Sequence, residues 1–486
     1  MIRRIIPIAV VLACGLLYSQ QGNQRPYQAT GFKICEVDQS SAIVWARLTR
    51  SSARIGKEGP MPIVQYADPQ TGELGPRRRG RPDSTPVVEF PNGSTVDTIE
   101  GAVPGAPGEV RVRYKPVGAE WSRSKWTAVD ASRDYTAQIK LEGLMANTAY
   151  EVEIRSRNGE TTGQTLRGRF QTAPSVERPE RVVFTVTTGT SYNDQDHSRG
   201  GFKMYGQMLA LAPSFFVHTG DIVYYDGQGK SLPLARWHWQ RMYSLPTNVD
   251  FHRQVASYFI KDDHDFFMND SWPGIETKFM GDFTWQQGLE VFPEQVGMGE
   301  KTYRTVRWGK DLQVWMVEGR DFRSPNNMPD GPEKTIWGAE QMAWFKRTVE
   351  ASDAAFRVLI SPTPVVGPDR ENKKDNHSNV VFQHEGDQVR DFLAQNNMVV
   401  VCGDRHWQYV SVDDKTGLRE YSTGPGSDEH AGGFRQELRG PEHRYLNIVG
   451  GFLSGTVDRE DGKPVLTFRH YSVDGDVLNE DRVLPN

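Results

Sequence analysis

The stretch from Phe215 to Asp226, FFVHTGDIVYYD, constrains the fold more than any other part of the sequence. Its apolar beginning, Phe215–Val217, is typical of a buried strand, and this pattern breaks at Thr219-Gly220. Asp221 follows directly, and Tyr224 comes three residues later. Because ligands of α/β sheets bind at the carboxyl ends of strands, a carboxylate at this point predicts a metal-binding loop. The alternative is a plain turn, in which Gly-Asp is common.

Two later clusters of ionisable residues repeat this arrangement. Asp262-Asp263-His264-Asp265 and Gly403-Asp404-Arg405-His406 each follow an apolar, strand-like run. Either cluster alone is also compatible with a surface turn. Three clusters of this kind, each placed at a predicted strand end, favour one shared site.

The residue types in these clusters suit a centre with two metal ions. Such ions lie about 3.5–4 Å apart and need one carboxylate to bridge them. We expect Asp221 to be the bridge, with Tyr224 in reach of one ion and Asp263 in reach of the other. Asp404 and His406 alternate along the chain, so each can serve one ion. The candidate ligands are therefore Asp221, Tyr224, Asp263, Asp404 and His406. His264 is expected to protonate a leaving alkoxide or to hold a phosphoryl oxygen.

The length of the chain indicates two domains. Its 486 residues exceed what one hydrophobic core usually organises. A hydrophobic content of 37% and a formal net charge of −5 are those of an ordinary soluble globular protein, and no nucleic-acid-binding domain is evident. The basic run at Arg77-Arg78-Arg79 and Arg81 lies among Gly and Pro, which favours a solvated loop.

The N-terminus has the pattern of a secretory signal peptide, which we place at residues 1–19. A basic start, Arg3-Arg4, precedes an apolar run from Ile5 to Leu17 that is too short to span a bilayer. We therefore expect an exported protein, periplasmic, secreted or on the outer surface, with no transmembrane segment beyond this peptide. Leu12-Ala13-Cys14 also resembles a lipoprotein processing site, so a lipid anchor at Cys14 is the alternative. Cys35 and Cys402 lie in strand-like runs and are expected to be buried free thiols.

Residues 27–174 have an all-β pattern. Strands are predicted at 42–48, 135–141, 150–154 and 168–173, with apolar and polar residues alternating. The segment around Tyr150 resembles the turn-and-tyrosine feature of fibronectin-type and immunoglobulin-like sandwiches. Residues 51–124 are rich in Pro, Gly and Arg, which indicates long loops or an insertion. A linker is predicted at 174–179.

From residue 180 to residue 486 strands alternate with helices. Apolar runs predict strands at 182–186, 215–217, 312–317, 356–360 and 398–402. A helical period links Phe202 to Ala212, and helices are also predicted at 338–352 and 385–396. The expected fold is thus α+β/β with two domains, an N-terminal β-sandwich followed by a layered α/β domain.

Taken together, these motifs resemble the calcineurin-like metallophosphoesterases, and more closely the alkaline phosphatase D (PhoD-like) family. HTGDIVYYD, DDHD and GDRHW are similar to the metal motifs of that family, and SSAIVWARLTR and RGRFQTAP are similar to its sandwich. The resemblance implies that Asp221 bridges the ions and that Tyr224 and His406 hold a ferric ion. It also implies that Asp263 and Asp404 hold companion divalent ions, often calcium.

The sequence departs from this family at the first strand. Relatives commonly carry an iron-binding Cys there, but this chain continues TTGTSYNDQDH and has no Cys between Cys35 and Cys402. Thr190 or Ser191 would replace a thiolate poorly, and manganese or zinc are then alternative ions. Further candidates for the missing ligand are Asp194, Asp196 and His197.

Three more residues are candidates for contacts with substrate. Arg320 partly matches a family segment, although Glu318 stands where an Asp is expected. Asn376 and His377 stand about where relatives carry a polar loop of the active site, and they are candidates for a ligand or a phosphate contact; the alternative is a loop cap.

The function predicted from these motifs is that of an exported metal-dependent phosphoesterase. A metal-activated hydroxide would attack a small phosphate mono- or diester in line, and His264 would assist departure of the alcohol. The alternative is a secreted protein that binds a surface or a polysaccharide through its sandwich, with a metallophosphatase fold that is catalytically impaired.

Overall fold

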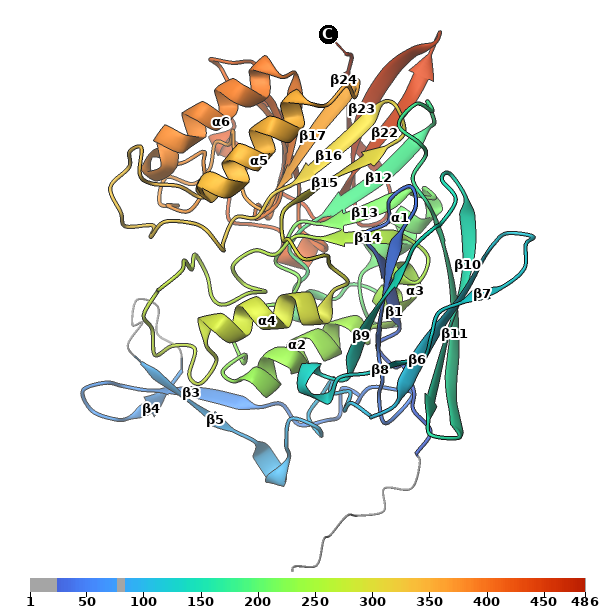
Figure 1. The fold of residues 1–486 in the computed structure, drawn as a ribbon. Coiled ribbons are helices and arrows are strands. Elements are labelled where there is room, and N and C mark those ends of the chain that lie inside the picture. Colours follow the sequence, from blue (N-terminus) through green and yellow to red (C-terminus); the bar gives the residue numbers. More distant parts are fainter. Residues whose placement is uncertain (1–23, 77–83, 486) are drawn as a thin grey trace, which may run out of the picture.

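The computed structural model describes residues 24–76 and 84–485 (Figure 1). The predicted signal peptide, Cys14 and the whole basic run lie outside these residues. Within them the chain forms two large mixed sheets, a second sheet of an N-terminal sandwich and a small three-stranded sheet. The described helices include none that is long and apolar enough to cross a membrane.

The nine-stranded sheet contains β13, the strand that precedes Asp221. Four adjacent strands at its centre pair in parallel: β12, β13, β14 and β1. The strands on either side of these four pair antiparallel. In spatial order the sheet consists of β24 (Val477–Val483), β23 (Lys463–Tyr471), β22 (Phe452–Glu460), β12 (Val182–Thr187), β13 (Phe215–His218), β14 (Ala256–Phe259), β1 (Phe32–Cys35), β2 (Ala42–Arg47) and β9 (Thr136–Leu141).

The seven-stranded sheet carries the later apolar runs. Its members β16, β17, β18 and β20 are parallel, and its other strands pair antiparallel. In spatial order it consists of β15 (Arg304–Trp308), β16 (Leu312–Met316), β17 (Phe356–Ser361), β18 (Met398–Cys402), β20 (Arg419–Thr423), β19 (Gln408–Val412) and β21 (His443–Asn447).

The two large sheets pack face to face, and helices cover their outer faces. Phe215 and Val217 of β13 share one buried cluster with Val314 and Val358 of the other sheet, while Phe216 faces the helices. This explains why the strands are apolar throughout, since both of their faces are buried. The helices are α1 (Lys203–Ala210), α2 (Leu232–Tyr243), α3 (Pro246–His252) and α4 (Trp285–Gln295) over the nine-stranded sheet, and α5 (Gly338–Glu350) and α6 (Gln383–Gln395) over the seven-stranded sheet (Figure 1).

The N-terminal region is a β-sandwich, as predicted. Its second sheet consists of β11 (Thr161–Gln171), β10 (Ala149–Asn158), β6 (Glu109–Pro116), β7 (Ser122–Arg123) and β8 (Thr127–Ala128). It packs on β1, β2 and β9 through Val112, Val152 and Ile139. The backbone N–H of Met145 donates to the Tyr150 hydroxyl at 2.8 Å, which is the contact of a tyrosine corner.

The two parts of the chain share one sheet. β1 pairs in parallel with β14 through Ile34 opposite Ala256, and β13 pairs with the other edge of β14 through Phe215. The sandwich therefore continues the sheet that leads to the site. Within the Pro- and Gly-rich region a small sheet of β4 (Leu74–Gly75), β3 (Ile63–Ala67) and β5 (Thr85–Glu89) forms.

The predicted strands and helices from Val182 to Cys402 are confirmed within a few residues. Cys35 and Cys402 are buried and free, as expected. The elements that were not predicted include β6, the small sheet, α2 to α4, the strands β15, β19, β20 and β21 of the seven-stranded sheet, and the three C-terminal strands.

Candidate metal centre

The three sequence clusters follow strands of the two large sheets, two of them after the neighbouring strands β13 and β14 and one after β18 of the other sheet. Asp221 follows β13 with a φ of 55°, and Asp404 follows β18 with a φ of 60°. Aspartate adopts this left-handed conformation more readily than most residues do. Gly220, between β13 and Asp221, has a φ of 111°, and a Cβ added there would lie 2.5 Å from Cβ of Asp262. Glycine thus allows the ends of β13 and β14 to approach each other closely.

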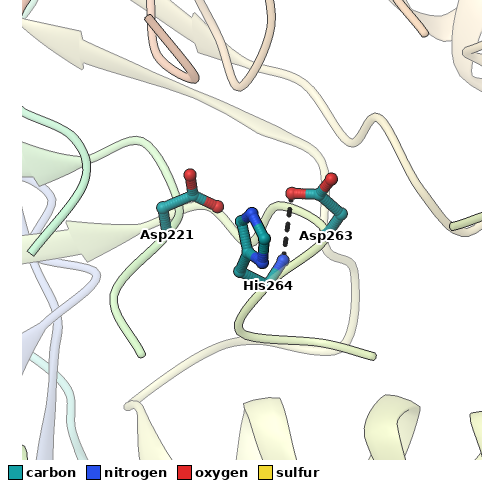
Figure 2. Close-up of side chains that lie close together, drawn as sticks. All are labelled: Asp221, Asp263 and His264. Carbon is teal, nitrogen blue, oxygen red and sulfur yellow. Dashed lines mark hydrogen bonds between the residues drawn. The ribbon is translucent and has the colours of Figure 1, made fainter. Parts of the chain in front are cut away.

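Asp221, Asp263 and His264 form a cluster that can hold a metal ion. One potential ligand atom from each lies within 4.8 Å of the others. Figure 2 shows the His264 ring between the two carboxylates, with the backbone N–H of His264 donating to Asp263 at 3.0 Å. Oδ1 of Asp221 is buried and has no hydrogen-bond partner. An unpartnered, buried carboxylate oxygen is costly unless a cation binds it, so the donor set fits a metal ion.

Tyr224 and two histidines lie on the other side of Asp221. The Tyr224 hydroxyl is 3.4 Å from Oδ2 of Asp221 and 3.5 Å from Nε2 of His406. Nε2 of His406 is 3.7 Å from the same Asp221 oxygen. The third contact is with His430, whose Nε2 is 2.7 Å from the Tyr224 hydroxyl. Asp221 is thus close both to this group and to Asp263.

A second group of carboxylates adjoins the first. Asp263, Asp270 and Asp375 each offer an oxygen within 4.8 Å of the others. Lys373 contacts Asp270 at 2.5 Å and Asp375 at 3.6 Å, so part of this negative charge is already compensated. Asp375 is fully buried, which would raise its pKa, but Lys373, Arg320 and other cations hold the pKa well below its ordinary value.

His264 is held by a carboxylate from the same loop as Asp221. Its Nδ1 contacts Asp226, and its ring lies 4.6 Å from the ring of Tyr224. Burial alone would lower the pKa of the imidazole, but Asp226, Asp263 and Asp221 raise the pKa well above its ordinary value. These carboxylates therefore stabilise the protonated form of His264.

The other titratable groups respond to the same surroundings. Burial would raise the pKa of Asp221, but the nearby His264, His406 and Arg320 outweigh it and hold this pKa below its ordinary value. Burial lowers the pKa of His406, which keeps its imidazole neutral and able to donate a lone pair. Burial, together with Asp221 and Asp263, raises the pKa of Tyr224 well above its ordinary value. Phenolate formation therefore requires a cation beside Tyr224.

Asp404 follows β18 of the second large sheet, and its contacts described here include none with Asp221, Asp263 or His264. Its backbone N–H donates to Oγ1 of Thr188 at 3.3 Å, which ties the end of β18 to the end of β12. Its carboxylate contacts the guanidinium of Arg405, which in turn binds Asp369 at 2.7 Å.

The predicted substrate-contact residues are all buried. Arg320 binds Asp262 at 2.5 Å and Asp375 at 3.3 Å, and it lies 3.6 Å from Asp263. The structure thus places Arg320 among the carboxylates and shows no surface through which it would meet a substrate. Nδ2 of Asn376 donates to Asp369 at 2.7 Å.

His377 lies away from the other predicted site residues. Its Nε2 is 2.9 Å from Glu385 of α6, and its ring packs edge-on against Trp337. The contacts of Asn376 and His377 described here include none with Asp221 or His264, so their roles at the site stay predictions.

The candidates for the missing cysteine have other partners. Oγ1 of Thr190 contacts Nε2 of His218 at 3.1 Å and donates to the Ile222 carbonyl at 3.0 Å. Asp196 accepts from the backbone N–H of Lys203 at the start of α1. Asp194 binds Nδ1 of His430 at 2.9 Å and so reaches the site indirectly.

Sequence reasoning missed His430, Asp270 and Asp375 as members of the site. None of them directly follows an apolar strand run, which was the signal that identified the other residues. His430 ends a short 3-10 turn, Asp428–His430, in a loop rich in Gly and acidic residues.

Two facing sheets with carboxylates and imidazoles after their strands are compatible with a metal-dependent phosphoesterase. The model of the PhoD-like phosphatase family matches residues 184–436, more than half of the chain. The protein therefore belongs to the PhoD-like phosphatase family and is a metal-dependent phosphatase.

Solved structures agree with this fold. The structure of PhoD is similar with a TM-score of 0.68 at 14% identity, over 95% of this chain and 90% of that one. The purple acid phosphatase PPD1 from yellow lupin (Lupinus luteus) seeds is similar with a TM-score of 0.63 at 11% identity, over 95% of this chain and 75% of that one. No curated protein matches the chain.

Proposed function

We propose that this protein is an exported phosphoesterase that hydrolyses small phosphate mono- or diesters at a centre of two or more metal ions. The observation that carries the proposal is the position of Asp221. Its buried carboxylate lies close to Tyr224 and His406 and also close to Asp263 and His264, and it keeps one oxygen unpartnered. Such a carboxylate is suited to bridging two cations.

The side chains divide into two groups around this bridge. Tyr224 and His406 would hold one ion, which the family resemblance makes iron. Asp263 and Asp404 would hold a companion ion, which the resemblance makes calcium, with manganese or zinc as alternatives. When bound, the ions would lower the pKa of an attacking water and neutralise charge on the phosphoryl oxygens.

His264 would supply the proton for the departing alcohol. Its Nδ1 is held by Asp226, which fixes the ring and leaves Nε2 as the proton-donating atom. The same contact stabilises the protonated imidazole, so the proton is available before the ester bond breaks.

A cavity of about 280 Å³ beside Tyr224 offers room for the organic part of a small ester. Ser191, Tyr192 and Arg241 line it together with Tyr224. Its modest volume favours small esters over large polymeric substrates.

The test of the function uses two aspartates that share a backbone conformation. Asp221 and the exposed hairpin residue Asp461 both have a positive φ, 55° and 49°, which asparagine also tolerates. Asp221→Asn should reduce kcat/KM for a nitrophenyl phosphate ester by about 100-fold or more, because an amide is a poor bridge between cations. Asp461→Asn should retain wild-type activity.

Metal content measured on the same samples decides between the alternatives. Wild-type turnover by an Asp221→Asn variant with full metal content would refute the assignment of the bridge. A wild type that binds metal ions but hydrolyses neither mono- nor diesters would favour the binding-only alternative. Export is tested by fractionating cells that express the chain with and without residues 1–19.

A further inference from the structure

A glycine, Gly189, lies two residues after the end of β12, the first strand of the metal domain. It has a φ of 52°. A Cβ added there would lie 3.3 Å from Cδ2 of His430 and 3.4 Å from Cδ2 of His406. It would also lie 3.3 Å from Cβ of Pro425, so a side chain at residue 189 would begin in contact with Pro425 and beside both imidazoles.

His430 is held in the geometry of a metal-ligating histidine. Its Nδ1 is 2.9 Å from Oδ2 of Asp194, so Nδ1–H donates to the carboxylate and the lone pair is left on Nε2. Carboxylates commonly orient ligating imidazoles in this way. The His430 ring lies 4.2 Å from the His406 ring, and its Nε2 is directed at the Tyr224 hydroxyl.

The spacing of the donor atoms agrees with a shared ion. Nitrogen and oxygen ligands lie about 2.0–2.2 Å from a transition-metal ion, so neighbouring ligands lie about 3 Å apart. The Tyr224 hydroxyl is 2.7 Å from His430, 3.5 Å from His406 and 3.4 Å from Asp221.

We propose that His430 is a ligand of the first metal ion and takes the place that a side chain at residue 189 would occupy. The site then offers two imidazoles, from His406 and His430, with the Tyr224 phenolate and the Asp221 carboxylate. The ligands predicted from the sequence for this ion, Asp221, Tyr224 and His406, include only one imidazole. Such a set suits zinc, iron and other borderline ions. This inference rests on the proposed metal centre, and it gives His430 and Asp194 roles there.

The competing role for His430 is a hydrogen bond that only orients Tyr224, and a glutamine substitution separates the two roles. Glutamine can still bond to the Tyr224 hydroxyl but is a poor ligand for a transition metal. Metal-free protein would be titrated with Co²⁺, with the visible absorption of the bound ion as the readout.

The ligand role predicts that His430→Gln and His430→Ala both weaken Co²⁺ binding at this site by 100-fold or more. Asp194→Asn should weaken it by about 10–100-fold, as is usual for a residue that orients a ligand. His384→Gln, on an exposed part of α6, should change nothing. Unchanged Co²⁺ affinity and absorption in His430→Gln would overturn the proposal.

A second variant tests the exchange directly. In Gly189→Cys/His430→Ala the thiol gains the space that the imidazole leaves. A sulfur-to-cobalt charge-transfer band in the near ultraviolet, absent from wild type and from His430→Ala, is the expected result. Failure of the band to appear in a folded double variant would show that residue 189 does not face the ion.

These readouts require no hydrolysis. If the wild type has no phosphoesterase activity, the proposed function is refuted. If the His430 variants of that same protein still lose Co²⁺ affinity, the ligand role of His430 is supported. Normal hydrolysis by the wild type, with unchanged Co²⁺ binding in His430→Gln, would support the proposed function and refute the ligand role of His430.

Discussion

Arg320 is expected to act mainly as a structural counter-charge. Its guanidinium is fully buried and lies 2.5 Å from Asp262, 3.3 Å from Asp375 and 3.6 Å from Asp263. Arg320→Leu would leave these carboxylates without their common cation in the protein interior. Removing one partner of a buried ion pair costs about 3–5 kcal/mol, because the remaining charge stays desolvated. We expect the free energy of unfolding to fall by this amount.

The loss is measured by urea unfolding of metal-free protein, at constant denaturant slope. Arg469→Leu is the matched control, because Arg469 pairs with Glu480 at 2.7 Å on the surface, where an ion pair contributes about 0–1 kcal/mol. Arg320→Lys keeps the charge but loses the planar fork, so an intermediate loss is expected. If Arg320→Leu unfolds like wild type and only raises KM, the reasoning fails and the substrate-contact role is supported.

The remaining predictions concern two histidines. His264 is not among the proposed ligands Asp221, Tyr224, Asp263, Asp404 and His406, so His264→Ala should retain bound metal. It should slow esters of poor leaving groups far more than nitrophenyl esters, because an alkoxide needs the proton most; equal slowing would leave His264 a positioning role. His470 is fully buried, and burial lowers its pKa to about 4, so the unfolded chain binds the proton first and stability is lost as the pH falls from 6.5 towards 4. Between pH 7 and pH 5 this loss is about 2 kcal/mol, at about 1.4 kcal/mol per pH unit. In metal-free protein, the loss of unfolding free energy between pH 7 and pH 5 should therefore be smaller in His470→Gln than in wild type by this amount. His384→Gln should behave as wild type. An unaltered pH dependence in His470→Gln would contradict the assignment.

The parts of the fold that could be predicted from the sequence are those where burial determines composition. β13 and β18 are buried on both faces, so their residues form short apolar runs that stand out in the sequence. β6 alternates buried and partly exposed residues within a region of Pro, Gly and Arg, and its surroundings hid the pattern. The pairing of β1 with β14 joins residues more than 200 positions apart, and no local signal specifies such a partner.

The candidate site divides in the same way. Asp221, Asp263 and His406 follow strands directly, so their positions follow from the strand pattern and from the rule that ligands bind at strand ends. His430 and Asp375 lie in irregular loops. In such loops the number of residues that separate a side chain from a strand does not predict where the side chain points. The absence of the cysteine can be read from the sequence, but the ligand proposed to replace it, His430, is far along the chain and is brought near Gly189 only by the fold.

The shared nine-stranded sheet gives the N-terminal sandwich a direct influence on the metal centre. β14 leads into Asp262 and Asp263, and it is held between β13 on one edge and β1 on the other. Without β1 the edge of β14 would expose unpaired backbone groups beside the site, and its position relative to β13 would depend on one set of hydrogen bonds. Because Asp221 and Asp263 must lie at a fixed spacing to share an ion, the sandwich supports the geometry of the centre as well as any attachment role of its own.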